Sequence, residues 1–289
     1  MESFKEEKKL GANHQSIRPH ITVVLAMSAD GKIADVNRSA ARFPSAADKA
    51  HLEQQVAKAD ATLFGAGTLR AYGTTLPVSN PVLIEQRRQR QQPDQPVQIV
   101  CSASGRLDPQ WRFFQQPIPR WFLTTAAGEA NWLTNWRAQQ PDVGAQQAGF
   151  EQTAGFEQIL VAQSPWSWPE IMTALKDPVN QGGNDKVGLV QAEYSSMILR
   201  PIHFLTVMGG GELVASLLAE ALIDELYLTI CPVLLGGATA PTPVGGDGFT
   251  FPEVPRLKLQ SARAVGDELF LHYSLLSRDS VAADSEAAI

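Results

Sequence analysis

The chain has 289 residues, of which 44% are hydrophobic and 19% charged, a composition ordinary for a globular protein with enough length for a full core. Its formal net charge of −6 argues against nucleic acid as a partner, because no basic face is indicated. No apolar run approaches the ~18 residues of a membrane span, and the charged N-terminal stretch has no secretory apolar core. We therefore expect no membrane partner and a cytoplasmic location.

Polarity indicates how the chain is organised. Residues 1–17 are charged and residues 277–289 are small and polar, so both predict flexible tails. Between them we expect one domain over 18–276, with an insertion or lid at about 176–200. The two cysteines, Cys101 and Cys231, lie in apolar runs and predict buried thiols rather than a disulfide.

Short apolar runs alternate with helical patterns along the chain. About eight runs predict strands: 21–27, 61–64, 97–101, 120–124, 158–162, 203–207, 225–230 and 269–273. Helices are predicted from Ser45 to about Lys58, over a short segment after Thr68, and over 129–139, 168–175 and 213–221. Ser45 and Thr68 are the expected caps of the first two helices. This alternation predicts an α/β fold whose mostly parallel central sheet carries helices on both faces.

A run of three glycines, Gly209–Gly211, separates a strand from a helix that places Leu213 and Val214 on its apolar face. Strand, glycine turn and helix is an arrangement that brings backbone N–H groups and a helix N-terminus to a phosphate. The alternative is a tight turn that binds nothing. Two other predicted strands also end in turns, at 26–32 and 65–68. Because parallel strands end at one edge of a sheet, we expect the three turns to surround one ligand crevice.

The sequence offers little support for other kinds of functional site. The five histidines lack ligand spacing, so no metal site is expected. A Rossmann glycine turn should follow the first strand, where this chain reads Ser-Ala-Asp-Gly-Lys instead. A nucleophile elbow and a Walker phosphate loop are absent. No dedicated catalytic residue is predicted.

Three segments, Arg18–Ala34, Ala59–Ala71 and Val207–Gly237, resemble the reductase domain of the bacterial riboflavin-biosynthesis deaminase–reductase. The resemblance covers roughly residues 18–274 and includes no deaminase half. It implies a dihydrofolate-reductase-like fold, NADPH as hydride donor and a ribosylamino-pyrimidine 5′-phosphate as substrate. It also implies domains that pair as a homodimer, for which the apolar 225–235 region is a candidate interface.

The resemblance also implies roles for particular residues. The cofactor residues would be Ala26, Thr68, Ser102, Gly209, Gly210, Gly211, Glu212, Leu213 and Val214. On the substrate side it implies Ser39, Lys49 and Leu76. Asp30, the one acid in the turns, is a further substrate-side candidate, although such a residue beside a glycine is often only a polar turn residue. Arg70 and Lys49 are candidates for meeting a substrate phosphate.

The substrate side departs from the family pattern at three positions. Tyr72 stands where the family has an acid, Ser79 where it has a phosphate-binding arginine, and Met208 where it has a glutamate. Three hypotheses therefore stay open: a reductase of a riboflavin precursor, a reductase of another small substrate, and a non-catalytic nucleotide-binding relative.

Overall fold

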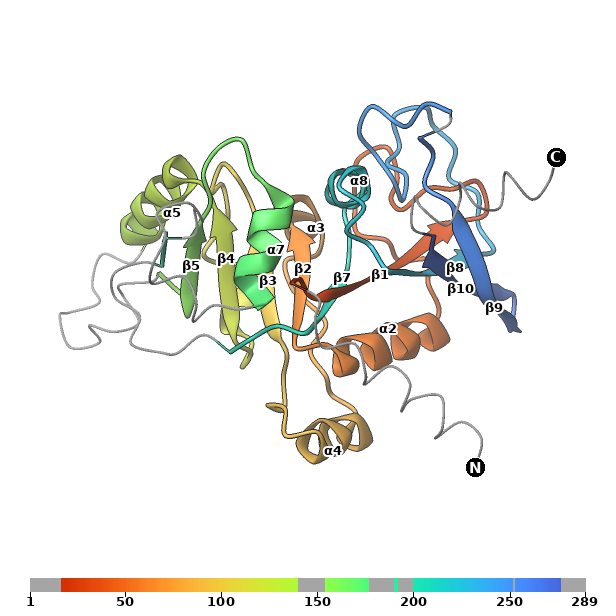
Figure 1. The fold of residues 1–289 in the computed structure, drawn as a ribbon, viewed down its shortest axis with the longest axis horizontal. Helices are drawn as coiled ribbons and strands as arrows, with labels where there is room; N and C mark the ends of the chain where they lie inside the picture. Colours follow the sequence, from red (N-terminus) through yellow and green to blue (C-terminus); the bar gives the residue numbers. More distant parts are fainter. Residues whose placement is uncertain (1–16, 140–153, 177–189, 192–199, 252, 277–289) are drawn as a thin grey trace.

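The computed structural model describes residues 17–139, 154–176, 190–191, 200–251 and 253–276, which share one ten-stranded sheet (Figure 1). In chain order the strands are β1 (His20–Ser28), β2 (Ala61–Gly65), β3 (Val97–Cys101), β4 (Arg120–Thr124), β5 (Gln158–Val161), β6 (Val190–Gln191), β7 (Phe204–Val207), β8 (Glu225–Cys231), β9 (Leu257–Val265) and β10 (Glu268–Leu275). The two expected tails, apart from Ile17, and most of the 176–200 insertion lie outside the described residues. The single-domain boundaries stay a prediction.

The sheet is mostly parallel, as expected. Its order is β6-β5-β4-β3-β2-β7-β1-β8-β10-β9. The seven strands from β5 to β8 in this order run parallel to their neighbours, while β6, β9 and β10 pair antiparallel. The helices between the strands are α2 (Ala46–Lys58), α3 (Ala66–Tyr72), α4 (Pro81–Gln89), the 3₁₀ turn η2 (Arg112–Gln115), α5 (Ala126–Gln139), α7 (Trp168–Lys176) and α8 (Gly211–Ala219).

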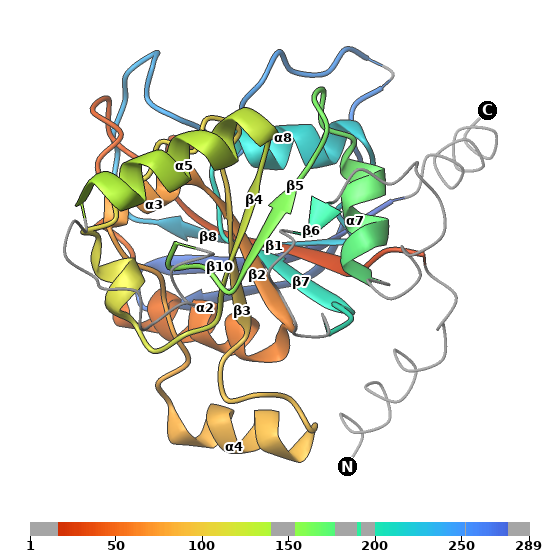
Figure 2. The ribbon, with the colours of Figure 1, turned by 90° about the vertical axis from the view of Figure 1, so that its left-hand side faces the viewer.

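Alternate residues of the central strands face two different helical layers. In β2, Leu63 joins a core cluster with α7 and α8, whereas its neighbour Phe64 joins a cluster with α3 and α5. β4 repeats this split with Leu123 and Phe122. Because successive side chains of a strand point to opposite faces, continuous apolar runs such as these need cover on both sides. Figure 2 shows α5 and α7 on opposite sides of β4 and β5.

The N-terminus of α2 confirms the predicted cap at Ser45. The Ser45 hydroxyl oxygen accepts from the backbone N–H groups of Ala47 and Asp48, at 3.0 and 3.3 Å. The predicted cap at Thr68 is wrong. The N-cap of α3 is Gly65, the last residue of β2, because the strand runs directly into the helix without a loop. Thr68 consequently lies inside the first turn of α3.

Two elements were not anticipated from the sequence. The strand β9 has no continuous apolar run, and all of its residues but Val265 are exposed, so no burial pattern marks it. It forms because a hairpin pairs it with β10. The helix α4 is not among the predicted helices; Asn80 caps it and Pro81 occupies its first turn. Cys101 and Cys231 are both free thiols, and no described helix is long and apolar enough to cross a membrane.

Candidate functional site

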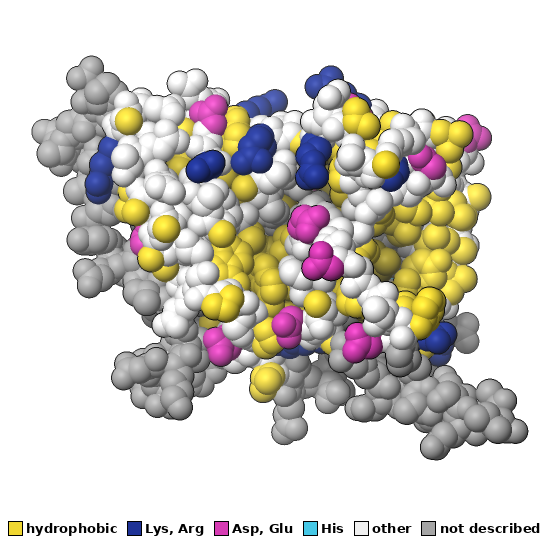
Figure 3. Space-filling model, turned by 90° about the horizontal axis from the view of Figure 1, so that it is seen from above, with side chains coloured by type: hydrophobic (Ala, Val, Ile, Leu, Met, Phe, Trp, Pro, Cys, Tyr) yellow, Lys and Arg dark blue, Asp and Glu magenta, His cyan; other side chains and the backbone are white. Residues whose placement is uncertain are grey.

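The carboxyl ends of the parallel strands form the edge at which the three expected turns meet. β7 pairs with β1 on one side and with β2 on the other, all in parallel. Their following turns therefore leave the sheet at one edge. Figure 3 looks onto the molecule from the side of α3 and α8 and shows Lys and Arg side chains distributed across this surface. Asp and Glu side chains are interspersed on the same face.

The glycine turn after β7 lies directly against the start of α3. The backbone N–H of Gly65 donates to the carbonyl of Gly209 at 3.2 Å. A Cβ placed on Gly209 or Gly210 would lie 3.5 or 3.7 Å from the Thr68 hydroxyl oxygen. Gly209 has a φ of +114°, a conformation that side-chain-bearing residues rarely adopt. The Gly209–Gly210 peptide bond is cis. The structure therefore brings Thr68 and the glycines together, as one site would require.

The N-terminus of α8 presents backbone donors beside this turn. Its N-cap is Gly210, which makes no side-chain cap hydrogen bond, and the first N–H groups of a helix have no intrahelical partner. Leu213 and Val214 are buried, so their side chains are not available to a ligand, and the N–H of Val214 already donates to the carbonyl of Gly210 at 3.1 Å. The side chain of Glu212 is otherwise engaged, since its Oε2 accepts from the N–H of Gly246 at 3.2 Å.

The remaining cofactor candidates lie on neighbouring strands of the same edge. Ala26 is half-buried near the end of β1 and pairs with Thr229 of β8. Ser102 directly follows β3 and is buried, with its N–H donating to the carbonyl of Leu123 at 3.0 Å. Since β3 lies on the far side of β2 from β7, Ser102 marks one end of the site and Ala26 the other.

Asp30 ties two loops together. Its Oδ1 accepts from the Ser28 hydroxyl at 2.6 Å and from the N–H of Leu235 at 3.0 Å, and its Oδ2 accepts from the N–H of Gly236 at 2.6 Å. These hydrogen bonds, that from Ser28 first, lower the pKa of Asp30 to about 2. The carboxylate is therefore ionised at neutral pH and holds no proton to give. A substrate-side role for Asp30 stays a prediction.

A cleft of about 890 Å³ opens between the loop after β1, the helix α3 and the loop after β8. We name it the arginine cleft, because Arg38, Arg42 and Arg70 all line it. Of the expected substrate residues, Ser39 is among its lining residues, whereas Asp30, Lys49 and Leu76 are not. Gly67, next to Thr68 in α3, also lines it, so the cleft reaches the first turn of α3, which carries Thr68.

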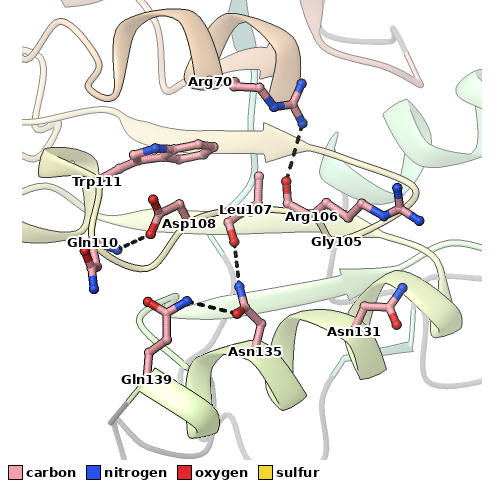
Figure 4. Close-up of a pocket in the computed structure, with 10 residues that line it drawn as sticks. All are labelled: Arg70, Gly105, Arg106, Leu107, Asp108, Gln110, Trp111, Asn131, Asn135 and Gln139. Carbon is pink, nitrogen blue, oxygen red and sulfur yellow. Dashed lines mark hydrogen bonds between the residues drawn. The ribbon is translucent and has the colours of Figure 1, made fainter.

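A second cleft, of about 620 Å³, lies between α3, the loop after β3 and α5 (Figure 4). Arg70 reaches across its mouth and donates to the carbonyl of Arg106 at 3.5 Å. Asn135 of α5 donates to the carbonyl of Leu107 at 2.8 Å on the opposite wall. Arg70 lines both clefts, which places it at their boundary.

Two buried acids were missed as site candidates by the sequence analysis. Asp48 of α2 lies against Thr229 of β8, and burial raises its pKa although the Thr229 hydrogen bond opposes the shift. Glu268 of β10 accepts from the N–H and the hydroxyl of Ser45, at 2.8 and 2.5 Å. Thr229 is the neighbour of Ala26, so Asp48 lies close to the cofactor end of β1. In the sequence, Asp48 follows Ser45 by three positions, a spacing that indicates a helix cap rather than a ligand site.

No group of three His, Cys, Asp or Glu suited to a metal ion occurs among the described residues.

The positions that depart from the family pattern have structural uses in this chain. Tyr72 receives the N–H of Ala41 on its hydroxyl oxygen at 3.0 Å and so holds the loop after β1. Ser79 donates to the Glu53 carboxylate through its N–H at 2.5 Å and its hydroxyl at 3.0 Å. Met208 packs against the core clusters of α2 and α3. None of the three presents a charge toward a ligand.

Comparison with known proteins identifies the fold. The chain is 24% identical to the riboflavin biosynthesis protein RibD of Actinobacillus pleuropneumoniae over 91% of its own length and 58% of the relative's. It is also 24% identical to a 2,5-diamino-6-ribosylamino-4(3H)-pyrimidinone 5′-phosphate reductase of Archaeoglobus fulgidus, over 87% of this chain and 95% of that one. The chain thus spans little more than half of RibD but nearly all of the archaeal reductase.

Solved structures show the same architecture. A RibD of Acinetobacter baumannii superimposes with a TM-score of 0.64 at 18% identity, covering 90% of this chain and 59% of that one. A pyrimidine reductase-like protein of Corynebacterium diphtheriae gives 0.62 at 18% identity, covering 90% and 92%. These similarities confirm the expected fold class. The model of the RibD C-terminal domain family matches residues 19–181 and 190–271, and the chain therefore belongs to that family.

Proposed function

We propose that the chain is an NADPH-dependent reductase of the riboflavin-pathway type. It would transfer a hydride to the ribose C1 of a substrate like 5-amino-6-(5-phosphoribosylamino)uracil. The observation that carries this proposal is the close approach of the glycine turn to Thr68 at the carboxyl edge of a parallel sheet. The pyrimidinone phosphate reductase activity named for the archaeal relative agrees with it.

The residues present fit a dinucleotide. Gly209 and Gly210 leave the backbone open to a phosphate, and no side chain within the described ranges caps the α8 N-terminus, so its first N–H groups and helix dipole favour an anion. Thr68 would add a hydroxyl donor from the other side. The second cleft begins three residues beyond Ser102 and offers Asn131, Asn135 and Arg106 to the far end of the cofactor.

When bound, NADPH would supply the hydride, and the protein would supply orientation and electrostatics. The half-buried Ala26 leaves room for a flat ring against β1. Because Asp30 is ionised and tied to Leu235 and Gly236, its role in this proposal is to fix the wall formed by the loop after β8.

A second candidate function is reduction of a different small substrate with the same cofactor. It is favoured by the contact between Ser79 and Glu53, which places a carboxylate where relatives would bind a phosphate. Growth rescue of a bacterium that lacks its riboflavin-pathway reductase separates the two candidates. Rescue supports the first, and NADPH binding without rescue supports the second.

The cofactor site has a direct test in Gly210. Gly210→Asp would place a carboxylate against the expected pyrophosphate, so NADPH binding, followed by its fluorescence, should be lost. Gly210→Ala is the matched control, because its Cβ would meet only the Thr68 oxygen at 3.7 Å, an ordinary contact. Unchanged NADPH affinity in Gly210→Asp would contradict the proposed site, and absence of NADPH binding in the unmodified chain would leave the non-catalytic hypothesis.

We also propose that the chain forms a homodimer in the cytoplasm. Leu257 and Leu259 of β9 and Leu269 of β10 are 43%, 52% and 38% exposed, and Figure 3 shows hydrophobic side chains gathered at the end of the molecule that holds β8, β9 and β10. Exposed apolar patches commonly mark interfaces. Sedimentation equilibrium should give twice the chain mass, and Leu259→Asp should shift it to the monomer.

A further inference from the structure

Three arginines surround the arginine cleft, and within the described residues none of them has a neutralising acid as a partner. Arg38 and Arg42 lie on the loop after β1, and Arg70 lies on α3. Among the residues that the structure describes, none of the three forms an ion pair, and the one side-chain hydrogen bond given for them runs from Arg70 to a carbonyl. Unpaired guanidinium groups facing one cavity favour an anion, and their planar donor array matches a phosphate.

Of the described residues that line this cleft, one is an acid, Asp35, and it does not cancel the charge of the three arginines. Asp35 directs its Oδ1 to the backbone N–H groups of Asn37 and Ser39, at 3.0 and 2.9 Å. It thereby shapes the turn that carries Arg38, whose φ of +58° lies in the left-handed region. With three arginines and one aspartate among the lining residues, the cleft keeps an excess of positive charge.

The loop that carries two of these arginines is anchored to α3. The Tyr72 hydroxyl oxygen accepts from the N–H of Ala41, the residue before Arg42, at 3.0 Å. Phe43 and Leu235 add apolar wall to the same cleft. The cavity therefore combines a charged rim with a surface on which a ring can lie.

The position that would otherwise hold the phosphate is closed. Ser79 and Asn80 both donate their backbone N–H to Glu53 Oε1, at 2.5 and 2.7 Å. A carboxylate already held there repels a second anion. A phosphorylated substrate needs its positive charge from somewhere else, and the arginine cleft reaches Gly67 in the first turn of α3, beside Thr68.

We propose that Arg38 and Arg42 bind the phosphate of a phosphorylated ribosyl substrate in the arginine cleft, in place of the Ser79 position. This proposal rests on the proposed reductase function, since it assigns the substrate end of the same site. Arg70 lies at the boundary with the second cleft and contributes to the field of both.

The test uses the full chain, with ribose 5-phosphate and ribose as probes, by calorimetry at low salt. The unmodified chain should bind ribose 5-phosphate well and ribose weakly. Arg38→Gln/Arg42→Gln should raise the Kd for ribose 5-phosphate at least ~10-fold, about the loss of one charge-assisted contact. The matched control is Arg112→Gln, an exposed arginine that lines neither cleft, and it should change the Kd less than ~2-fold.

NADPH affinity of the same variants separates this proposal from the reductase function. It should stay within ~2-fold in the double variant. Loss of NADPH binding with ribose 5-phosphate binding unchanged would assign the cleft to the cofactor and overturn the proposal. An equal effect of Arg112→Gln, or equal binding of ribose and ribose 5-phosphate, would also overturn it. Failure of the unmodified chain to bind NADPH would reject the reductase function, while the ribose 5-phosphate result would still decide the cleft.

Discussion

Ser79 and Glu53 are joined through two hydrogen bonds to one carboxylate oxygen, from the Ser79 N–H at 2.5 Å and its hydroxyl at 3.0 Å. Asn80, the N-cap of α4, adds its own N–H to the same oxygen. The carboxylate of α2 therefore organises the start of α4. A residue at a family substrate position has become part of the contact between two helices.

The stability that this contact gives should depend on pH. Burial alone would raise the pKa of Glu53, but the hydrogen bonds from Asn80 and Ser79 outweigh it and the pKa lies below its usual value. A depressed pKa means that the contribution is present above the unfolded-state value and is lost as the pH falls through the folded-state value. Glu53→Gln should therefore lower the free energy of unfolding at pH 7, with the difference shrinking toward pH 3 in urea titrations. A difference independent of pH would show that the ionised carboxylate is not responsible.

Of the adjacent residues Arg87 and Arg88, Arg87 should contribute more to the stability of the fold. Its guanidinium is fully buried and donates to the carbonyls of Ala57, Ala59 and Pro93 at 3.0, 2.6 and 2.7 Å. Arg87→Met should cost about 3 kcal/mol, because it removes the Arg87 donors to the carbonyls of Ala59 and Pro93, whereas Ala57 keeps Arg90 as a donor at 2.7 Å. Arg88 pairs with Asp94 at the surface, so Arg88→Met should cost less than about 1 kcal/mol. Urea unfolding of both variants measures the difference, and equal costs would contradict the assignment.

Gly211 should tolerate no side chain. A Cβ there would lie 2.4 Å from the carbonyl oxygen of Thr242. Thr242 belongs to a loop that is held to α8, because the N–H of Gly245 donates to the carbonyl of Gly211 at 3.0 Å. Gly211→Ala should force this loop away and destabilise the protein by roughly 1–3 kcal/mol. Gly210→Ala, whose Cβ would make only an ordinary contact with the Thr68 hydroxyl oxygen at 3.7 Å, should be close to neutral in the same thermal unfolding experiment. Similar losses in the two variants would mean that the loop yields freely.

Neither cysteine should react in the folded protein. Burial raises the pKa of both the Cys101 and the Cys231 thiol to about 12, and Glu268 adds to the effect at Cys231. Because the thiolate is the reactive form, native protein at pH 8 should show negligible reaction with a disulfide reagent such as DTNB. In urea both cysteines of the chain should react. Fast labelling of one thiol before unfolding would contradict the predicted burial.

Some of these features could be predicted from the sequence and some could not. Continuous apolar runs mark β1 to β5, β7 and β8, and three consecutive glycines mark the glycine turn. The strand β9 lacks such a mark because a hairpin partner, not burial, defines it. Asp48 and Glu268 came together only through tertiary contacts between α2, β8 and β10. The arginine cleft was missed for the same reason, since Arg38 and Arg70 lie on separate elements.

Substitutions of Thr68 should separate an effect on the stability of the fold from an effect on ligand binding. Its hydroxyl oxygen lies 3.5 Å from where a Cβ of Gly209 would be, and within the described part of the chain that hydroxyl has no hydrogen-bond partner. Thr68→Val keeps the shape and removes the donor, so the free energy of unfolding should change by less than about 0.5 kcal/mol. If the hydroxyl donates to a cofactor phosphate, the Kd for NADPH should rise roughly tenfold. Thr68→Ser, which keeps the donor, should restore binding to within ~3-fold, whereas equal binding by Thr68→Val and the unmodified chain would remove Thr68 from the cofactor site.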